Sequence, residues 1–229
     1  MSNGENAVNL TYLGNSCILV TSPRGTRIVS DPYGTIRPPG LTDLPADLAA
    51  EAVTVSHTHE DHNNINAVNG NPQVLTEPGV FTINDFKVTG LMGWEGSPSG
   101  PSTTMRNIIF FYEVEGIKIV QLGDSGVITD SKTIESISNA DLVVVNIDGY
   151  VIPHEQVIPF MREINARTIF LAHYTLTGQE NWCGAPTAEE FANLFAPELK
   201  VLRSSSHIVV HKAMPEQIAI SQPLMLINS

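Results

Sequence analysis

Four side chains of the kinds that bind metal ions fall within six residues of this chain. The run follows the apolar segment 52–56 and contains His57, His59, Asp61 and His62. Side-chain direction repeats every second residue in an extended chain, so His57 and His59 can face the same side. A turn or helix start after His59 would let Asp61 and His62 reach a second position. The spacing therefore favours two neighbouring metal ions over one.

Neutral imidazoles and carboxylates are ligands that suit Zn, Mn and Fe. A metal ion held in this way lowers the pKa of a coordinated water to roughly 7, which creates a nucleophile at neutral pH. The run therefore indicates a hydrolytic metal centre. The alternative is a polar turn with histidines facing solvent, which explains a lone loop histidine better than it explains four ligands in six residues.

Two further apolar segments deliver metal-ligand side chains at their ends. Segment 117–122 leads to Asp124, which lies in a glycine-containing turn, and segment 168–172 leads directly to His173. Asp124 could bridge two metal ions, and His173 could be a terminal ligand. Taken alone, each is better explained as an Asp in a turn or a His packed against its neighbours. Three apolar strand ends carrying ligands together make a metal site the better explanation.

The elements that must position these groups follow from the hydrophobic pattern. The first half alternates short apolar runs with turn residues, which predicts strands at 9–13, 17–21, 26–30, 80–90, 107–113 and 117–122. The second half alternates strands and helices, which is typical of α/β layering. We expect helices at 131–138 and 154–164, and strands at 142–147, 168–172 and 207–211. One domain over residues 1–229 is the simplest organisation at this length.

A last helix is predicted to begin after Thr187. Glu190 follows three residues later, which is the capping-box pattern of a helix N-terminus. Phe191, Leu194 and Phe195 are expected to face the core from this helix. A cofactor role for these aromatic residues is not indicated.

Composition limits the classes of partner. The formal net charge is -12, which argues against binding of a nucleic-acid phosphate backbone. No apolar segment approaches the roughly 20 residues of a membrane span, and the first residues lack the basic and apolar regions of a signal peptide. Cys17 and Cys183 form no C-x-x-C pair. We expect a cytoplasmic protein with a small-molecule substrate, and the sequence leaves open whether it forms a homo-oligomer.

Together these residues resemble the metallo-β-lactamase fold superfamily, and within it the small metal-dependent hydrolases similar to ascorbate-6-phosphate lactonase. The likeness covers nearly the whole chain. It includes the segment 10–17, Asp31-Pro32-Tyr33, the run from His57 to His62, Gly123-Asp124, Ala140-Asp141, the Asp148-Gly149 segment and Ala172-His173-Tyr174. The resemblance implies an α/β fold in the form of a four-layered αββα sandwich.

The resemblance also implies a ligand set and a cofactor. His57 and His59 would hold the first metal, Asp124 would lie between the metals, and the second would be held by Asp61, His62 and His173. The implied cofactor is one or two divalent metal ions, with Zn ranked ahead of Mn and Fe. Asp61 is the candidate catalytic residue, because it could orient or deprotonate the nucleophile as well as bind metal.

The chain departs from the family pattern at one ligand position. The family places another first-site histidine between the second and third motifs, but no histidine occurs between His62 and His154. Glu95 lies near the vacant position and could substitute as an oxygen ligand, which would favour harder metals such as Mn or Fe. The alternative is a solvated loop carboxylate. The Gly-, Pro- and Ser-rich stretch 93–102 around it is either an ordinary surface connection or a substrate loop.

The function that these patterns favour is hydrolysis of an ester, a lactone or a phosphoester of a small molecule by a metal-activated water. No Ser or Cys nucleophile is then required. The competing hypothesis is a degenerate, non-catalytic metal-binding protein that keeps the fold and has lost turnover with its missing histidine. No motif in the sequence identifies the substrate.

Overall fold

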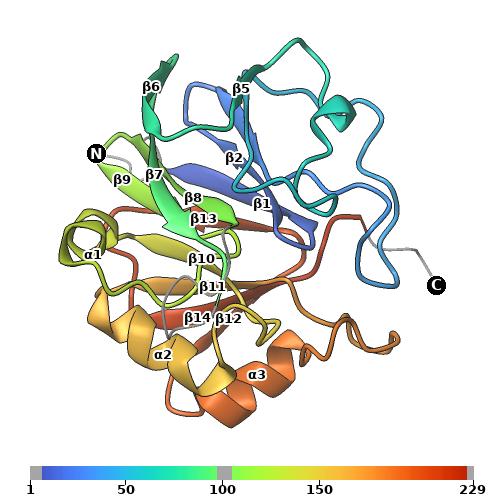
Figure 1. Ribbon diagram of the computed structural model, residues 1–229, viewed down its shortest axis with the longest axis vertical. Helices are drawn as coiled ribbons and strands as arrows, with labels where there is room; N and C mark the ends of the chain where they lie inside the picture. Colours follow the sequence, from blue (N-terminus) through green and yellow to red (C-terminus); the bar gives the residue numbers. More distant parts are fainter. Residues whose placement is uncertain (1–6, 97–104, 226–229) are drawn as a thin grey trace.

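Two mixed β-sheets pack face to face in the computed structural model, which describes residues 7–96 and 105–225 (Figure 1). The first sheet has the order β13 (His207–Val210), β1 (Val8–Gly14), β2 (Cys17–Thr21), β3 (Arg27–Ser30), β4 (Ala52–Thr54), β5 (Gln73–Leu75). The second has the order β12 (Val201–Ser204), β14 (Gln217–Ser221), β11 (Thr168–Ala172), β10 (Leu142–Asn146), β9 (Ile117–Gln121), β8 (Arg106–Val114), β7 (Phe86–Trp94), β6 (Gly79–Ile83).

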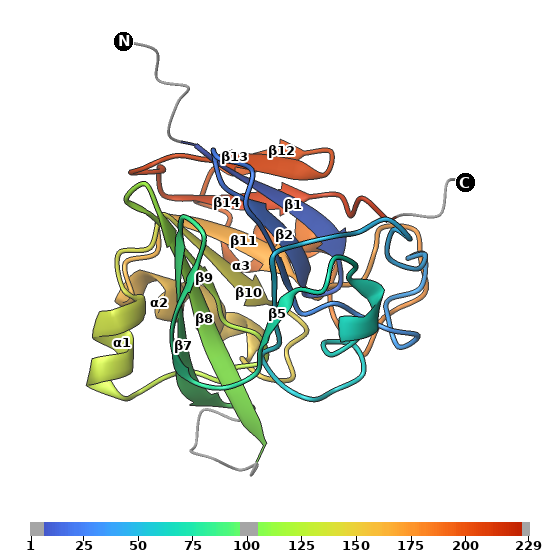
Figure 2. The same ribbon diagram turned by 90° about the horizontal axis from the view of Figure 1, so that it is seen from above.

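Within the described residues, three α-helices lie along the second sheet, on the side away from the first (Figures 1 and 2). They are α1 (Ser131–Ile137), α2 (His154–Glu163) and α3 (Ala188–Phe195). Beside the first sheet lie the short 3-10 helix η1 (Ile65–Ala67) and long connecting segments. The layering confirms the expected α/β sandwich of the metallo-β-lactamase type.

Helix α3 begins as its sequence predicts. The Thr187 hydroxyl accepts from the backbone N–H of Glu190, and the Glu190 carboxylate accepts from the backbone N–H of Thr187. Phe191 is fully buried and Phe195 packs against the core, as expected. The expectation for Leu194 is wrong, because this side chain is 70% exposed. On a helix of eight residues the buried stripe is narrow, and Leu194 lies beyond its edge.

Parallel pairing aligns the strand ends that matter for chemistry. Strands β9, β10 and β11 run parallel in the second sheet, as do β3 and β4 in the first. The carboxyl ends of parallel strands meet at one edge of a sheet, and ligands bind there in open α/β sheets. Every residue of β10 and β11 is buried, as expected for parallel strands covered on both faces. The fold therefore brings the loops after five strands together.

The two sheets are joined by a packed interior with a few polar contacts across it. The rings of Tyr12 in β1 and Phe170 in β11 pack edge to face with centroids 5.3 Å apart. The Thr54 hydroxyl in β4 lies 2.6 Å from the Tyr112 hydroxyl in β8. The buried apolar side chains form one continuous cluster through both sheets. This rigid interior fixes the strand ends relative to one another.

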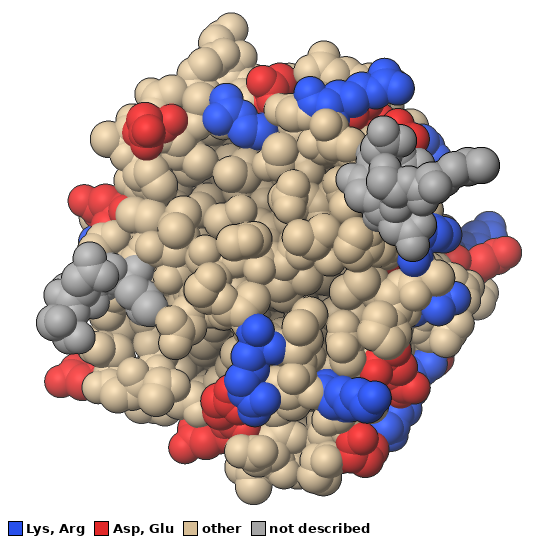
Figure 3. Space-filling model, turned by 180° about the vertical axis from the view of Figure 1, so that it is seen from behind, with Lys and Arg blue, Asp and Glu red and all other residues tan. Residues whose placement is uncertain are grey.

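The surface drawn in Figure 3 has Lys and Arg side chains next to Asp and Glu side chains, around a broad area that carries neither. Basic residues on this face are therefore interspersed with acidic ones. Within residues 7–96 and 105–225, no helix is long and apolar enough to cross a membrane. Residues 97–102 of the candidate substrate loop lie outside the described residues.

Candidate metal centre

The ligand-rich run starts where β4 ends and turns back on itself. The backbone N–H of His62 donates to the carbonyl of His59 over 3.0 Å. The rings of His57 and His62 consequently lie side by side, with centroids 4.2 Å apart. The expected turn after His59 is therefore confirmed, and it folds the later ligands of the run against the earlier ones.

Asp61, His62 and His173 form one ligand group, which we name the second half-site. Oδ2 of Asp61 lies 3.2 Å from Nε2 of His173 and 3.6 Å from Nε2 of His62. His173 directly follows β11 with a left-handed backbone (φ 55°), and its N–H donates to the carbonyl of Asn15. Nε2 of His62 is buried and makes no hydrogen bond. This nitrogen lies near the carboxylates of Asp61 and Asp124 but forms a hydrogen bond with neither, which suits a metal ligand.

His57, His59 and Glu95 form another ligand group. We name it the first half-site, because His57 and His59 are the ligands expected for the first metal. Nε2 of His57 lies 3.0 Å from Nδ1 of His59, and Nε2 of His59 lies 3.9 Å from Oε2 of Glu95. One ligand atom from each residue lies within 4.8 Å of the other two. His57 is buried, whereas the side chain of His59 is 41% exposed. This half-site is therefore the more open of the two.

Asp124 lies between the half-sites. Its Oδ2 is 3.5 Å from Nε2 of His57, and its Oδ1 is 3.5 Å from Nε2 of His62. Two asparagines hold it: Asn107 accepts from its backbone N–H, and Asn146 donates to Oδ1 over 2.7 Å. Because each carboxylate oxygen faces a different half-site, the geometry suits a bridging ligand.

Asp31 at the end of β3 orients two of the histidines. It accepts from the backbone N–H and the hydroxyl of Ser56, and it lies 3.1 Å from Nδ1 of His62. Because the Ser56 hydroxyl donates to Asp31, its oxygen accepts from Nδ1 of His57, 2.9 Å away. Both rings are thereby held with Nε2 toward the centre, the arrangement by which outer partners fix metal-binding histidines.

Two further residues support the second half-site. Oδ2 of Asp148 lies 3.2 Å from Nδ1 of His173, and Oδ1 of Asp148 accepts from the N–H of Tyr150. The Asn15 amide donates to the carbonyl of Asp61 and lies 3.5 Å from its Oδ2. The Asn15 amide therefore supports the site, because it holds Asp61.

The electrostatics of the cluster favour a bound positive charge. Burial disfavours a charged imidazole, yet Asp124 and Asp31 raise the pKa of His62 to about 9. Burial, together with the charge on His62, lowers the pKa of His57 to about 4. Although burial opposes it as well, Asp148 and Asp61 raise the pKa of His173. Carboxylates that attract a proton so strongly will also attract a cation.

The spacing of the ligand atoms fits metal coordination. Four-coordinate ligands at about 2.1 Å from a metal ion lie ~3.4 Å from one another. The imidazole nitrogens and carboxylate oxygens around Asp61 and Asp124 lie 3.2 to 3.6 Å apart. The donor chemistry, the spacing and the lone Nε2 of His62 therefore fit one or two divalent metal ions.

The structure brings all six predicted ligands into one cluster, whose members are His57, His59, Asp61, His62, Asp124 and His173. Sequence reasoning did not assign roles to Asp31, Ser56, Asn146 or Asp148. Asp31 and Asp148 each follow an apolar strand and lie in segments that carry the family resemblance, but no signal in the sequence assigns them to particular histidines. Their contacts with histidines depend on strand order, which the residues alone do not specify.

Comparison with known families agrees with this geometry. Residues 9–173 match the model of the beta-lactamase superfamily domain. A UPF0173 metal-dependent hydrolase from Cupriavidus taiwanensis is 28% identical over 225 residues, which cover 79% of this chain and 77% of the relative. The family match over residues 9–173 includes the residues of both half-sites.

Solved structures show the same architecture. A crystal structure from Thermotoga maritima, described as a proposed Zn-dependent hydrolase of the metallo-beta-lactamase superfamily, is 25% identical with a TM-score of 0.74 and covers 94% of this chain and 98% of that one. An isothiocyanate hydrolase from Delia radicum gut bacteria has a TM-score of 0.64 at 15% identity, and the match covers 96% and 98% of the two chains. This second likeness concerns the fold alone. The chain belongs to the beta-lactamase superfamily domain family and has the metallo-β-lactamase fold.

Proposed function

We propose that this protein is a metal-dependent hydrolase acting on an ester, a lactone or a phosphoester of a small molecule. The observation that carries the proposal is the pair of half-sites on either side of Asp124, with ligand atoms spaced for metal binding. The relatives described as metal-dependent hydrolases support it. Because one fold hosts many chemistries, the site and not the architecture must support the reaction.

Each half-site would hold one divalent ion, and Asp124 would contact both. His62 and His173 would offer Nε2 to the second ion, because their Nδ1 atoms face Asp31 and Asp148. When bound, such an ion lowers the pKa of a coordinated water and polarises a substrate oxygen. The protein would contribute ligand orientation and negative charge around the reacting group.

Asp61 is the residue we assign to proton transfer. Its carboxylate lies in the second half-site, and its side chain is 15% exposed, whereas that of His62 is fully buried. It can therefore reach a water molecule while it contacts His173. The Asn15 amide, which donates to the carbonyl of Asp61, limits its movement. From this position Asp61 would orient the attacking water and accept its proton.

A cavity beside the first half-site supports a substrate of modest size. Its volume is about 340 Å³, within the range of small-molecule sites. Met92, Trp94 and Ile109 line it together with Glu95 and Ser125, the latter next to Asp124 in the chain. Thr129, Asp130 and Thr133 add polar groups to this lining. The cavity therefore suits a small molecule that carries both apolar and polar groups and whose reacting group lies at the metal centre.

The decisive experiment combines metal analysis with a panel of esters, lactones, phosphomonoesters and phosphodiesters. We expect turnover of at least one class, its loss after chelation, and its return when Zn, Mn or Fe is added. Asp61→Asn should lower kcat more than it raises KM, because it removes a proton acceptor and keeps the size of the side chain. Cys17→Ser should leave turnover intact, because Cys17 is a buried strand residue.

Turnover by verified metal-free protein would contradict the proposal. The second candidate, a non-catalytic metal-binding protein, is favoured by the absence of a third first-site histidine. Tight stoichiometric metal without turnover across the whole panel would select that second candidate.

A further inference from the structure

Glu95 occupies a fixed and enclosed position next to two metal-ligand histidines. It follows the last residue of β7, and its backbone N–H donates to the carbonyl of Met105. An isolated antiparallel bridge joins it to Ser125, which follows Asp124 in the chain. The backbone hydrogen bond to Met105 and the β-bridge to Ser125 thus hold Glu95 beside the candidate metal centre.

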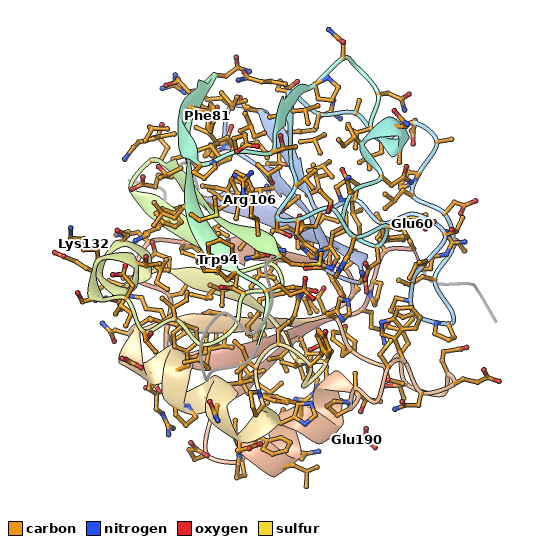
Figure 4. All side chains as sticks on the ribbon, in the orientation of Figure 1. Glu60, Phe81, Trp94, Arg106, Lys132 and Glu190 are labelled. Carbon is orange, nitrogen blue, oxygen red and sulfur yellow. The ribbon has the colours of Figure 1, made fainter. Side chains whose placement is uncertain are left out.

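The burial of Glu95 decides between the two interpretations of this residue, a metal ligand or a solvated loop carboxylate. Glu95 is only 2% exposed, and its Oε2 lies 3.9 Å from Nε2 of His59. Glu60, which lies within the ligand-rich run itself, shows the contrasting case: it is exposed and accepts from the Thr35 hydroxyl. Figure 4 shows Glu60 well apart from Trp94, the residue before Glu95. A carboxylate is seldom enclosed in this way without a charged or hydrogen-bonding role.

We propose that Glu95 is the third protein ligand of the first half-site, where it shifts metal preference away from zinc and toward iron and manganese. The inference rests on the proposed function, because it concerns the same centre. With Glu95, the half-site presents two imidazoles and one carboxylate. Oxygen donors suit harder ions, and a two-histidine, one-carboxylate set with open positions is typical of non-haem iron. Affinity alone favours Zn at most such sites, so the effect is a change in the ratio of bound metals.

The proposal is tested by loading metal-free protein with equal amounts of Mn and Zn and measuring bound metal by elemental analysis. Mn is also followed by its paramagnetic resonance signal. We expect two equivalents in the wild type and one in Glu95→Gln, with affinity for the other lowered at least about tenfold. Glu95→His should bind two equivalents with a lower Mn-to-Zn ratio. Glu60→Gln is the matched control, since it removes an exposed carboxylate of the ligand-rich run that lies apart from Glu95, and it should resemble the wild type. The same comparison is made with Fe(II) under anaerobic conditions.

Two equivalents with the wild-type Mn-to-Zn ratio in Glu95→Gln would overturn the proposal. Retention of one equivalent by that variant also shows that it is folded. If it loses both, recovery of two in Glu95→His supports the ligand role, and failure to recover them contradicts it. Metal binding that depends on Glu95 in a protein without turnover would leave this inference standing while the hydrolase proposal fails. A wild type that binds no metal would overturn both.

Discussion

The two half-sites of the candidate centre differ in the groups that contact the outer ring nitrogens of their histidines. In the second, both histidines have a carboxylate near the ring nitrogen turned away from the centre: Asp31 lies 3.1 Å from His62, and Asp148 lies 3.2 Å from His173. Both rings are buried. These carboxylates fix the ring orientation and increase the basicity of the nitrogen that faces the metal position.

Among the described residues, no carboxylate lies directly behind the ring of His57 in the first half-site. His57 is backed by the Ser56 hydroxyl, a neutral group. His59 is partly exposed, and the carboxylate that lies 3.9 Å from its Nε2 is that of Glu95, the proposed third ligand of this half-site. Weaker support and greater exposure predict weaker and more exchangeable metal binding. The comparison teaches that similar ligands can form a tight and a labile site, depending on their outer contacts.

The largest effect is expected from Asp124→Ala, because the two carboxylate oxygens of Asp124 face different half-sites. We expect neither equivalent to survive gel filtration, with affinities lowered more than about 100-fold. Elemental analysis of the purified variant measures this. Asp47→Ala, which changes an exposed carboxylate, is the control. One equivalent retained at wild-type affinity would mean that the half-sites are independent.

The next largest effect is a difference in metal loss between variants of the two half-sites. His62→Ala should abolish stoichiometric binding, because His62 belongs to the second half-site and also groups with His57 and Asp124. His59→Ala should lose only the weaker equivalent. Competition with a chromogenic chelator resolves the two affinities, and His211→Ala, at an exposed strand end, is the control. If His59→Ala lost both equivalents and His62→Ala only one, the assigned asymmetry would be reversed.

Metal removal should destabilise the fold, since the ligands come from loops after several strands. A metal ion present at 100 times its Kd stabilises the folded state by about 2.7 kcal/mol. For a chain of this size that corresponds to a Tm change of about 5–10 °C. Thermal unfolding during stepwise chelation should show a small loss with the first equivalent and most of the loss with the second. An unchanged Tm in verified metal-free protein would contradict this.

Most strands could be predicted because their residues alternate or are continuously apolar. The segment 80–90 was expected as one strand, but it is a hairpin of β6 and β7 that turns at Asn84, with a φ of 50°. Strands β5, β12 and β14 were not predicted. They are short, and β5 and β12 lie at sheet edges, where the apolar pattern is weak.

The ligands after β4, β9 and β11 could be predicted because their residue types are distinctive and each follows an apolar run. The position of Glu95 could not, because it depends on a bridge to Ser125, about thirty residues later in the chain. The role of Asp31 likewise depends on the pairing of β3 with β4. Local chemistry thus identifies candidate ligands, and long-range strand pairing decides which outer contacts they receive.

The smallest effect is expected from Asp148→Asn, which tests outer support of the second half-site alone. The amide oxygen can still accept from the N–H of Tyr150, so the loop should keep its shape. The amide nitrogen would then face Nδ1 of His173, and two donors would oppose each other where a carboxylate now stands. This disfavours the tautomer that leaves Nε2 available, so affinity for the tighter equivalent should fall about tenfold. The weaker equivalent should be unchanged in the same titration, with Asp43→Asn at an exposed position as the control. Equal weakening of both equivalents would show that Asp148 acts on the whole centre and that the contrast between its halves has another cause.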